Sequence, residues 1–273
     1  MKSVDLNYFI DLVRKRTGIE LSDDKGYLIE SRLRPLAETW GLKDVASLLE
    51  TVRLKPDPRL VDSVVDIMTT NETFFFRDET PFKALSEALV RLAAVRGSSP
   101  IRIWSAACST GQEPYSIAMI AQEAMARAPN LKVEIVATDI SERCLTKART
   151  GVYSQFEVQR GVAIRRLMQN FDQEGASWRV KSDLRSQITW RNANLMENFR
   201  ALGRFDIIFC RNVLIYFSRD VRRDILERMA LQMAPDGLLF LGAAENTLGI
   251  TDALVQNPAG PGWQTKRTAS KVA

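Results

Sequence analysis

Histidine is absent from this chain of 273 residues, and its absence excludes whole classes of chemistry. Without an imidazole, neither a Ser-His-Asp triad nor a Cys-His pair can form, and the usual histidine-containing zinc sites are excluded. Cysteine is scarce as well. Cys108, Cys144 and Cys210 are too few and too widely spaced for a four-cysteine zinc site or a disulfide framework. We therefore expect reduced thiols, a cytoplasmic location and no bound metal.

Long apolar runs are also missing. No stretch of about 18 apolar residues occurs, so we expect no segment that spans or inserts into a membrane. The opening segment MKSVDLNYFIDLVRKR has acids inside its apolar stretch and no small-residue cleavage site, which argues against a secretory signal. With 45% hydrophobic and 26% charged residues, the composition is that of a globular protein.

Hydrophobic periodicity divides the chain into a helical part and an alternating part. Apolar residues recur at helical spacing in 4–16, 42–53 and 58–70. Ser22-Asp23-Asp24 can cap one more helix, which runs to about Leu36. After residue 79, helices alternate with apolar strand candidates at 101–107, 133–140, 188–195, 205–214 and 237–244. Alternation of this kind is typical of a doubly wound α/β sheet.

These patterns predict the domain organisation. We expect an all-helical N-terminal domain over residues 1–78, a linker helix over 79–100 and an α/β domain over 101–265. Residues 150–195 interrupt the strand–helix rhythm, and the partial alternation of SWRVKSDLRSQITWR predicts a small antiparallel β-subdomain there. The tail, residues 257–273, is expected to be mobile.

Polar residues follow the strand candidates at the ends where open α/β sheets bind ligands. Gly111 permits a tight turn after the first strand. Asp139 ends the second strand, where an acid either holds ribose hydroxyls or serves as a cap or surface residue. Glu113 either pairs with a ligand's ammonium group or complements a helix dipole. Because no G-x-G-x-x-G fingerprint is present, the pattern favours an adenosine-containing ligand without a pyrophosphate, such as S-adenosylmethionine.

Five segments carry a resemblance to a known family. They are TTNETFFFRD (69–78), WSAACSTGQEPYSIAM (104–119), ATDIS (137–141), NANL (192–195) and FDIIFCRNVLIYF (205–217). In this order they resemble the chemotaxis receptor methyltransferase family, CheR. The resemblance implies a helical domain followed by a Rossmann-like methyltransferase domain with an inserted β-subdomain. It also implies methyl transfer from S-adenosylmethionine to glutamate side chains of bacterial chemoreceptors for chemotactic adaptation, giving glutamate methyl esters and S-adenosylhomocysteine.

The resemblance also implies a set of site residues. By motif position, the cofactor contacts would be Asn71, Thr73, Arg77, Glu113, Asp139, Asn194 and Leu195, with Arg211 and Asn212 lining the same pocket. Arg77 and Tyr216 would stand closest to the methyl group as the catalytic residues. Cys108 and Cys210 are interpreted as packing residues. Some family members dock on a receptor's C-terminal peptide, but QNFDQEGASWRV is short and lacks a glycine-rich loop, so tethered docking is not carried over.

Positive charge is concentrated in the second part of the chain. Residues 1–80 hold 12 basic and 15 acidic side chains, and residues 81–273 hold 26 and 18, so the net charges are −3 and +8. The densest basic stretch contains Arg160, Arg165, Arg166, Arg179, Lys181, Arg185 and Arg191. It is either a solvated face or a patch for an anionic partner. We predict that it steers the cytoplasmic domains of chemoreceptors, helped by Arg32 or Arg34.

Two other functions compete with this hypothesis. The basic excess invites a nucleic-acid methyltransferase, but the N/D-P-P-Y/F type of motif and an aromatic-rich basic groove are both missing. A methyltransferase-like binding module would be expected to lose Arg77, Asp139 or Tyr216, and all three are present. The sequence therefore predicts a monomeric enzyme without a nucleic-acid partner.

Overall fold

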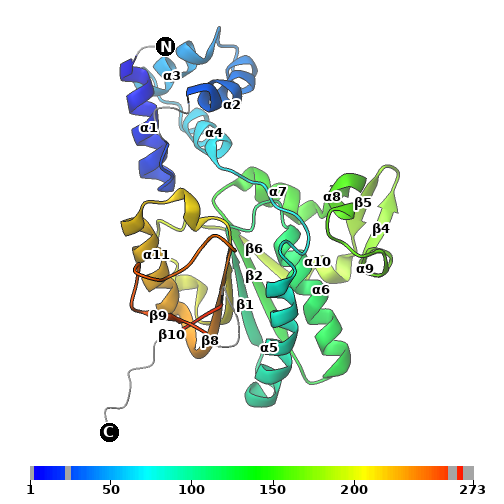
Figure 1. Cartoon of the computed structure of the whole chain (residues 1–273). Helices are drawn as coiled ribbons and strands as arrows, with labels where there is room; N and C mark the ends of the chain where they lie inside the picture. Colours follow the sequence, from blue (N-terminus) through cyan, green and yellow to red (C-terminus); the bar gives the residue numbers. More distant parts are fainter. Residues whose placement is uncertain (1–2, 22–25, 258–262, 267–273) are drawn as a thin grey trace. The chain divides into compact units, whose positions relative to one another are not determined.

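The computed structural model describes residues 3–21, 26–257 and 263–266 (Figure 1). The chain forms two compact units: Met1–Thr70 with Tyr216–Val221, and Asn71–Ile215 with Arg222–Ala273. Residues 71–78, which the sequence interpretation grouped with the helical domain, thus belong to the second unit. The physical reason is that Phe75 and Phe76 are buried in the core of that unit.

The first unit is a cluster of helices. Its helices are α1 (Ser3–Thr17), α2 (Gly26–Thr39), α3 (Val45–Leu54) and α4 (Pro58–Met68). Their apolar faces form one core that includes Phe9, Leu33 and Leu48. Asp44 and Asp57 cap α3 and α4 by accepting backbone N–H bonds, whereas the cap expected at 22–24 lies outside the described residues. Tyr216–Val221 joins this unit through an antiparallel bridge between Ile19 and Phe217.

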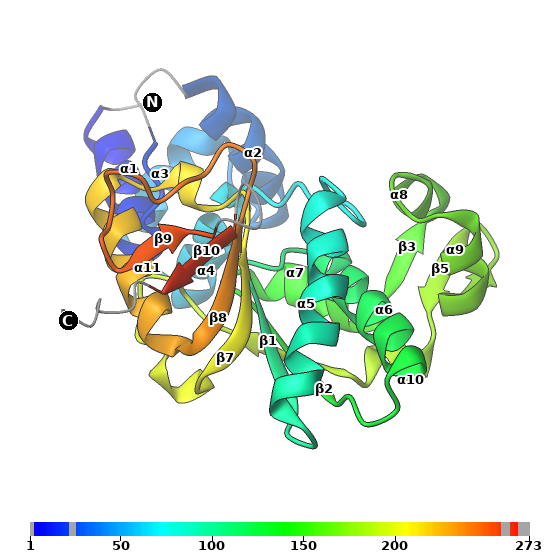
Figure 2. The ribbon, with the colours of Figure 1, turned by 60° about the horizontal axis from the view of Figure 1, so that its bottom comes forward.

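The second unit contains a seven-stranded sheet with the order β6-β2-β1-β7-β8-β10-β9 (Figure 2). Its strands are β1 (Ile101–Ala106), β2 (Val133–Asp139), β6 (Ile188–Asn192), β7 (Phe205–Cys210), β8 (Met233–Leu241), β9 (Leu254–Gln256) and β10 (Trp263–Lys266). The first five strands in this order are parallel, and β10 is antiparallel to both β8 and β9. The strand order reverses between β1 and β7, which is where open sheets of this kind bind ligands.

Helices cover both faces of this sheet (Figure 1). They are α5 (Thr80–Arg96), α6 (Gln112–Arg127), α7 (Glu142–Thr150) and α11 (Arg219–Gln232), with short 3-10 turns η2 (Arg200–Leu202) and η3 (Leu214–Tyr216). The crossovers through α6 and α7 run towards β6, whereas the crossover through α11 runs from β7 to β8. Because parallel crossovers are right-handed, α11 covers the opposite face from α6 and α7. The predicted doubly wound fold is thereby confirmed.

A small antiparallel sheet is inserted between α7 and β6. It has the order β3-β5-β4 and consists of β3 (Val152–Ser154), β4 (Phe171–Glu174) and β5 (Ser177–Val180). The short helices α8 (Gln155–Gln159), α9 (Ile164–Asn170) and α10 (Ser182–Arg185) flank it. Tyr153, Phe171 and Trp178 bury their side chains in the main core of the unit. We call residues 151–185 the β-subdomain.

The structure corrects two local expectations. The Pro235-Asp236-Gly237 segment, predicted as a turn before a strand, lies inside β8, because a register shift opposite Phe205 and Ile207 absorbs the extra residues. Trp263–Lys266 lies in the tail that was expected to be mobile, yet it forms β10. Its backbone pairs with Phe240, Leu239 and Leu238 of β8.

Asp206 ties three elements together at the start of β7. Its Oδ1 accepts from Arg96 Nε at 2.9 Å and Nη2 at 2.7 Å, and its Oδ2 accepts from the backbone N of Arg102 at 2.9 Å. Arg96 also contacts Asp236 at 2.5 Å, which lowers the pKa of that carboxyl. The side chain of Asp206 is 11% exposed and that of Asp236 is 49% exposed.

We predict that Asp206→Asn lowers the unfolding free energy of the second unit by about 2–3 kcal/mol, because charge-assisted hydrogen bonds are lost at a largely buried site. Urea denaturation followed by tryptophan fluorescence measures this change, because Trp104, Trp178 and Trp190 lie in the second unit. The matched control is Asp236→Asn, which should cost about 1 kcal/mol or less because its ion pair is half exposed. Equal losses for the two variants would contradict the assignment.

Candidate active site

The loop after β1 is tightly folded. Ala107, Ser109 and Gly111 have φ angles of 54°, 49° and 96°, in the left-handed region. A Cβ on Gly111 would lie 2.8 Å from Ala148 Cβ and 2.9 Å from the Tyr153 hydroxyl, so only glycine fits there. Strained backbone of this kind gathers at functional sites, and the loop lies at the strand-order reversal between β1 and β7.

Asp139 holds this loop against the end of β2. Its Oδ2 accepts from Ser109 N at 2.7 Å and its Oδ1 accepts from Ser141 N at 2.8 Å, and the residue is 5% exposed. Beside it, the Thr138 hydroxyl accepts from Trp104 Nε1 at 2.9 Å. A ligand's hydroxyl would have to share the Asp139 carboxylate with these backbone groups.

Glu113 is buried in the first turn of α6. It accepts from the Ser105 hydroxyl at 2.8 Å and from Arg211 Nη1 at 3.0 Å. Burial raises the pKa of Glu113, and the charge of Arg211 opposes that rise. Both carboxylate oxygens thus have partners within the protein, and a ligand's ammonium group would have to share them.

Arg211 follows β7 and is deeply buried, with 2% of its side chain exposed. Besides Glu113, its Nη2 donates to Arg77 O at 2.7 Å and to Asp78 Oδ2 at 2.8 Å. Its Nε is buried without a hydrogen-bond partner among the described residues. Arg211 therefore fixes the segment of Arg77 and Asp78 to the sheet and keeps one donor available.

Residues 71–78 cross the loop after β1 in a strained conformation. The Ser109 hydroxyl donates to Asn71 O at 2.7 Å, and Phe76 N donates to the Ser116 hydroxyl at 3.0 Å. Phe76 and Asp78 have φ angles of 52° and 65°. The guanidinium of Arg77 donates to Glu72 O at 3.1 Å within the same segment. The half-buried Thr73 is carried on this segment as well.

The β-subdomain packs on the same segment. Edge-to-face aromatic contacts join Phe75 to Tyr153 and to Phe171, with ring centroids 5.0 Å and 5.6 Å apart. A Cβ on Gly161 would lie 2.0 Å from Phe75 O, so the backbone of the β-subdomain meets this segment directly. Arg160 pairs with Glu72 at 3.2 Å. The insertion therefore supports the backbone that carries Asn71, Thr73 and Arg77.

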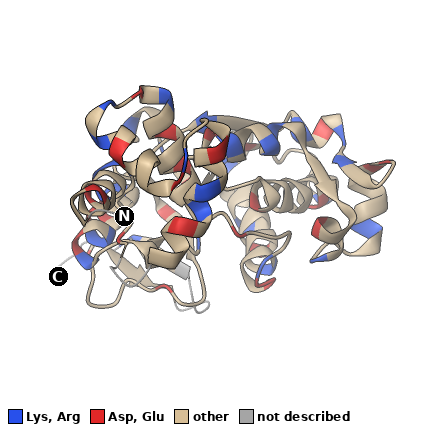
Figure 3. Ribbon diagram, turned by 90° about the horizontal axis from the view of Figure 1, so that it is seen from above, with Lys and Arg blue, Asp and Glu red and all other residues tan. Residues whose placement is uncertain are grey.

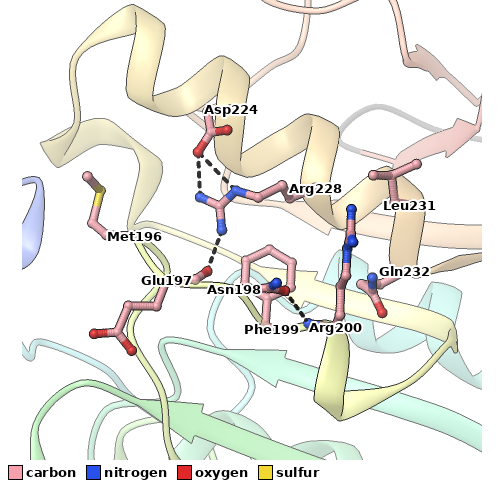
Figure 4. Close-up of a pocket in the computed structure, with 9 residues that line it drawn as sticks. All are labelled: Met196, Glu197, Asn198, Phe199, Arg200, Asp224, Arg228, Leu231 and Gln232. Carbon is pink, nitrogen blue, oxygen red and sulfur yellow. Dashed lines mark hydrogen bonds and ion pairs between the residues drawn. The ribbon is translucent and has the colours of Figure 1, made fainter.

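The loop after β6 carries Asn194 and Leu195. Ala193 N donates to Asp139 O at 3.0 Å, which places this loop beside the end of β2. Arg228 of α11 donates to Leu195 O at 2.8 Å. Figure 4 shows its other contacts, with Glu197 O at 2.5 Å and with Asp224 at 2.6 Å. The cavity of about 410 Å³ in Figure 4 lies between this loop and α11.

The structure thus brings most of the predicted residues to one edge of the sheet. Hydrogen bonds link the segments of Asn71, Arg77, Glu113, Asp139, Asn194 and Arg211 in the second unit. Asn212 follows Arg211 with a φ of 59°. Tyr216 groups with the first unit, where its carbonyl accepts from Glu20 N at 3.1 Å.

Sequence reasoning missed two residues that shape the site, Arg228 and Glu245. Arg228 lies on a helix rich in charged residues, and the sequence does not indicate which of these charges faces the site. Glu245 follows the last apolar strand candidate, and the strand-end logic that found Asp139 would have found it too. Cys108 and Cys210 are fully buried, and burial raises their thiol pKa values, which suits packing residues.

Two kinds of feature are absent from the part of the chain that the structure describes. No helix in that part is long and apolar enough to cross a membrane. No group of three or more His, Cys, Asp or Glu side chains within the described ranges could hold a metal ion.

Comparison with known proteins gives consistent matches over both units. Residues 71–259 match the family described as CheR methyltransferase, SAM binding domain, and residues 4–69 match CheR methyltransferase, all-alpha domain. The chain is 42% identical over 265 residues to chemotaxis protein methyltransferase Cher2 of Pseudomonas putida, covering 95% of this chain and 96% of that protein. It is 36% identical over 241 residues to the chemotaxis protein methyltransferase of Salmonella typhimurium, covering 86% and 81%.

We predict that Arg228→Met loosens the loop after β6, because the carbonyls of Leu195 and Glu197 lose their charged donor. Hydrogen–deuterium exchange of peptides covering 193–202 should be faster by about tenfold or more, corresponding to roughly 1.5 kcal/mol or more of lost local stability. Arg200→Met is the matched control, since the Arg200 guanidinium lines the same cavity without a partner among the described residues. Unchanged exchange in Arg228→Met would show that the loop is held by other contacts.

Proposed function

The chain belongs to the CheR methyltransferase family, and from that premise we propose how its residues transfer a methyl group to chemoreceptors. The activity is that of an S-adenosylmethionine-dependent chemotaxis protein-glutamate methyltransferase, which yields glutamate methyl esters and S-adenosylhomocysteine. The observation that carries this conclusion is the family match over residues 71–259, a range that contains every candidate site residue. We further propose that the enzyme acts as a monomer in the cytoplasm on the cytoplasmic domains of its receptors.

The residues at the edge of the sheet suit S-adenosylmethionine. Asp139 offers acceptors for ribose hydroxyls, and a phosphate cradle is not needed for this ligand. Glu113 is the acid nearest the start of α6 for an ammonium group, and the orphaned Nε of Arg211 is a buried donor beside it. The cofactor-binding set proposed here is Asn71, Thr73, Arg77, Glu113, Asp139, Asn194, Leu195, Arg211 and Asn212.

The chemistry asks little of the protein in proton transfer. When bound, S-adenosylmethionine supplies a methyl group activated by a sulfonium. A receptor glutamate with an ordinary pKa of about 4.3 is already a carboxylate at neutral pH, so no general base is required. The lack of histidine is therefore no obstacle to this activity.

The protein contributes orientation and exclusion of water, which are worth up to roughly 7–11 kcal/mol for well-placed partners. Strong hydrogen bonds to the attacking carboxylate would favour the ground state, because that group loses charge in the reaction. We therefore assign Arg77 and Tyr216 to orienting the reactants. Arg211 sets the backbone of Arg77 by holding its carbonyl.

A methyl-ester assay tests the proposed activity. The protein is incubated with radiolabelled S-adenosylmethionine and receptor cytoplasmic fragments, and the labelled product is then treated with base. A carboxyl methyl ester releases methanol in base, whereas an N-methyl product keeps its label. Label that stays on the receptor after base treatment would overturn the proposal of glutamate as the acceptor.

We predict that Asp139→Ala weakens binding of S-adenosylhomocysteine about tenfold to a hundredfold, because a charge-assisted hydrogen bond contributes roughly 1.5–3 kcal/mol. Isothermal calorimetry measures the affinity. The matched control is Asp172→Ala on β4, an exposed acid of the β-subdomain, which should bind like the wild type. Wild-type affinity in Asp139→Ala would remove Asp139 from the proposed cofactor site.

The surface of the enzyme that attracts the receptor is expected to consist of basic residues that are not already paired with acids. Figure 3 marks acidic and basic residues along the ribbon, and both kinds occur in the β-subdomain. Among its arginines, Arg160 pairs with Glu72, Arg166 with Glu123 and Arg179 with Glu174, and Arg185 donates to Val180 O. Arg165, Lys181 and Arg191 have no side-chain partner among the described residues. These three are the charges best able to attract the glutamate-rich helices of a receptor.

We predict that the double variant Arg165→Glu/Arg191→Glu lowers receptor methylation at low salt, and that the difference from wild type shrinks at high salt, because exposed charges act within about 8–10 Å. Initial rates at several salt concentrations measure this effect, and S-adenosylhomocysteine affinity should stay unchanged. The control is Glu174→Gln/Arg179→Gln, which removes a paired charge of each sign. If trimming the receptor's last residues abolishes methylation while the reversed charges have no effect, the enzyme uses tethered docking instead.

A further inference from the structure

Glu245 lies just beyond β8, and its carboxylate is enclosed by backbone N–H groups. Oε2 accepts from Asn212 N and Gly242 N, both at 2.7 Å. Oε1 accepts from Val213 N at 2.9 Å and from Leu214 N at 2.7 Å. The residue is 8% exposed. Its carboxylate thus uses four backbone donors from two separate strand-end loops.

The four donors match the acceptors that a carboxylate offers. A carboxylate has about four acceptor sites on two oxygens and no donor, which matches the four N–H groups. An amide in its place would direct an NH2 group at two of these donors and leave them unsatisfied. Three of the donors are consecutive, from Asn212 to Leu214, and consecutive N–H groups form an anion-binding concavity.

The surrounding backbone is shaped to admit this carboxylate. A Cβ on Gly242 would lie 2.7 Å from Glu245 Oε2 and 2.9 Å from Asn212 N, so a side chain there would separate the two loops. Asn212 has a φ of 59°, a left-handed conformation that turns its N–H and the next two inward. Gly242, Asn212 and Glu245 therefore form one hydrogen-bonded cluster, which we call the Glu245 cluster.

The Glu245 cluster is connected through the loop after β7 to residues of the proposed site. Arg211, immediately before the enclosed N–H groups, holds Glu113 and the carbonyl of Arg77. Leu214, the last donor, begins the turn η3 that ends at Tyr216. We propose that Glu245 is a positioning residue for methyl transfer, which fixes the loop after β7 and so sets Arg211, Asn212 and the start of the Tyr216 turn. This inference rests on the proposed function.

The test compares wild type with Glu245→Gln and Gly242→Ala. The first removes acceptors from the Glu245 cluster, and the second adds a Cβ that crowds it. Receptor methylation gives kcat, and calorimetry with S-adenosylhomocysteine gives the affinity together with the number of binding sites per chain. We expect kcat per binding site to fall about tenfold to a hundredfold in both variants, the size of one charge-assisted hydrogen bond. The affinity should fall less, because Asp139 and the loop after β1 stay in place. Glu87→Gln, an exposed change on α5, is the matched control.

A purely structural role would behave differently. It would lower the number of binding sites per chain, while kcat per remaining site would stay at the wild-type value, and that result would overturn the proposal. Wild-type turnover in Glu245→Gln would overturn it as well. If Glu245→Gln does not fold, Glu245→Asp is tested in its place, because aspartate keeps the charge but has a shorter side chain. Wild-type kcat per binding site in Glu245→Asp would overturn the proposal. An inactive wild type would instead indicate failure of the proposed function.

Discussion

The buried guanidinium of Arg211 is the interaction on which the site depends. It joins Glu113 of α6, the carbonyl of Arg77 and the carboxylate of Asp78 to the end of β7. Removing one partner of such a buried pair costs several kcal/mol because the remaining charge stays desolvated. The strained segment 71–78 is therefore kept in place by electrostatics, with aromatic packing from the β-subdomain as its second support.

Buried carboxylates organise the rest of the site. Asp139 fixes the loop after β1 through Ser109, Glu113 fixes Arg211, and Glu245 fixes the loop after β7. Each of these acids accepts hydrogen bonds from the protein itself, which suits a scaffold better than a proton shuttle. This arrangement agrees with the chemistry, because an ionised glutamate needs no base and gains most from preorganised geometry.

Charge on the surface follows a different rule from charge in the site. The sequence shows a net excess of basic residues after residue 80, but the structure pairs Arg160, Arg166 and Arg179 with acids. Acids such as Glu72 and Glu123 lie far from these arginines in the sequence and close to them in space. Net charge therefore identified the region of the chain and did not identify the charges available to a partner.

The sequence by itself determined the doubly wound sheet, the helical first unit and the strand-end position of Asp139, because periodicity and apolar runs are local properties of the chain. The family motifs added the positions of the remaining candidate residues. Only the tertiary structure decided that Arg211 holds Arg77, that Glu245 gathers four N–H groups and that Trp263–Lys266 completes the sheet. These features join residues that are distant in the sequence, and the hydrogen-bond partners of a side chain are set by packing, which no local pattern records.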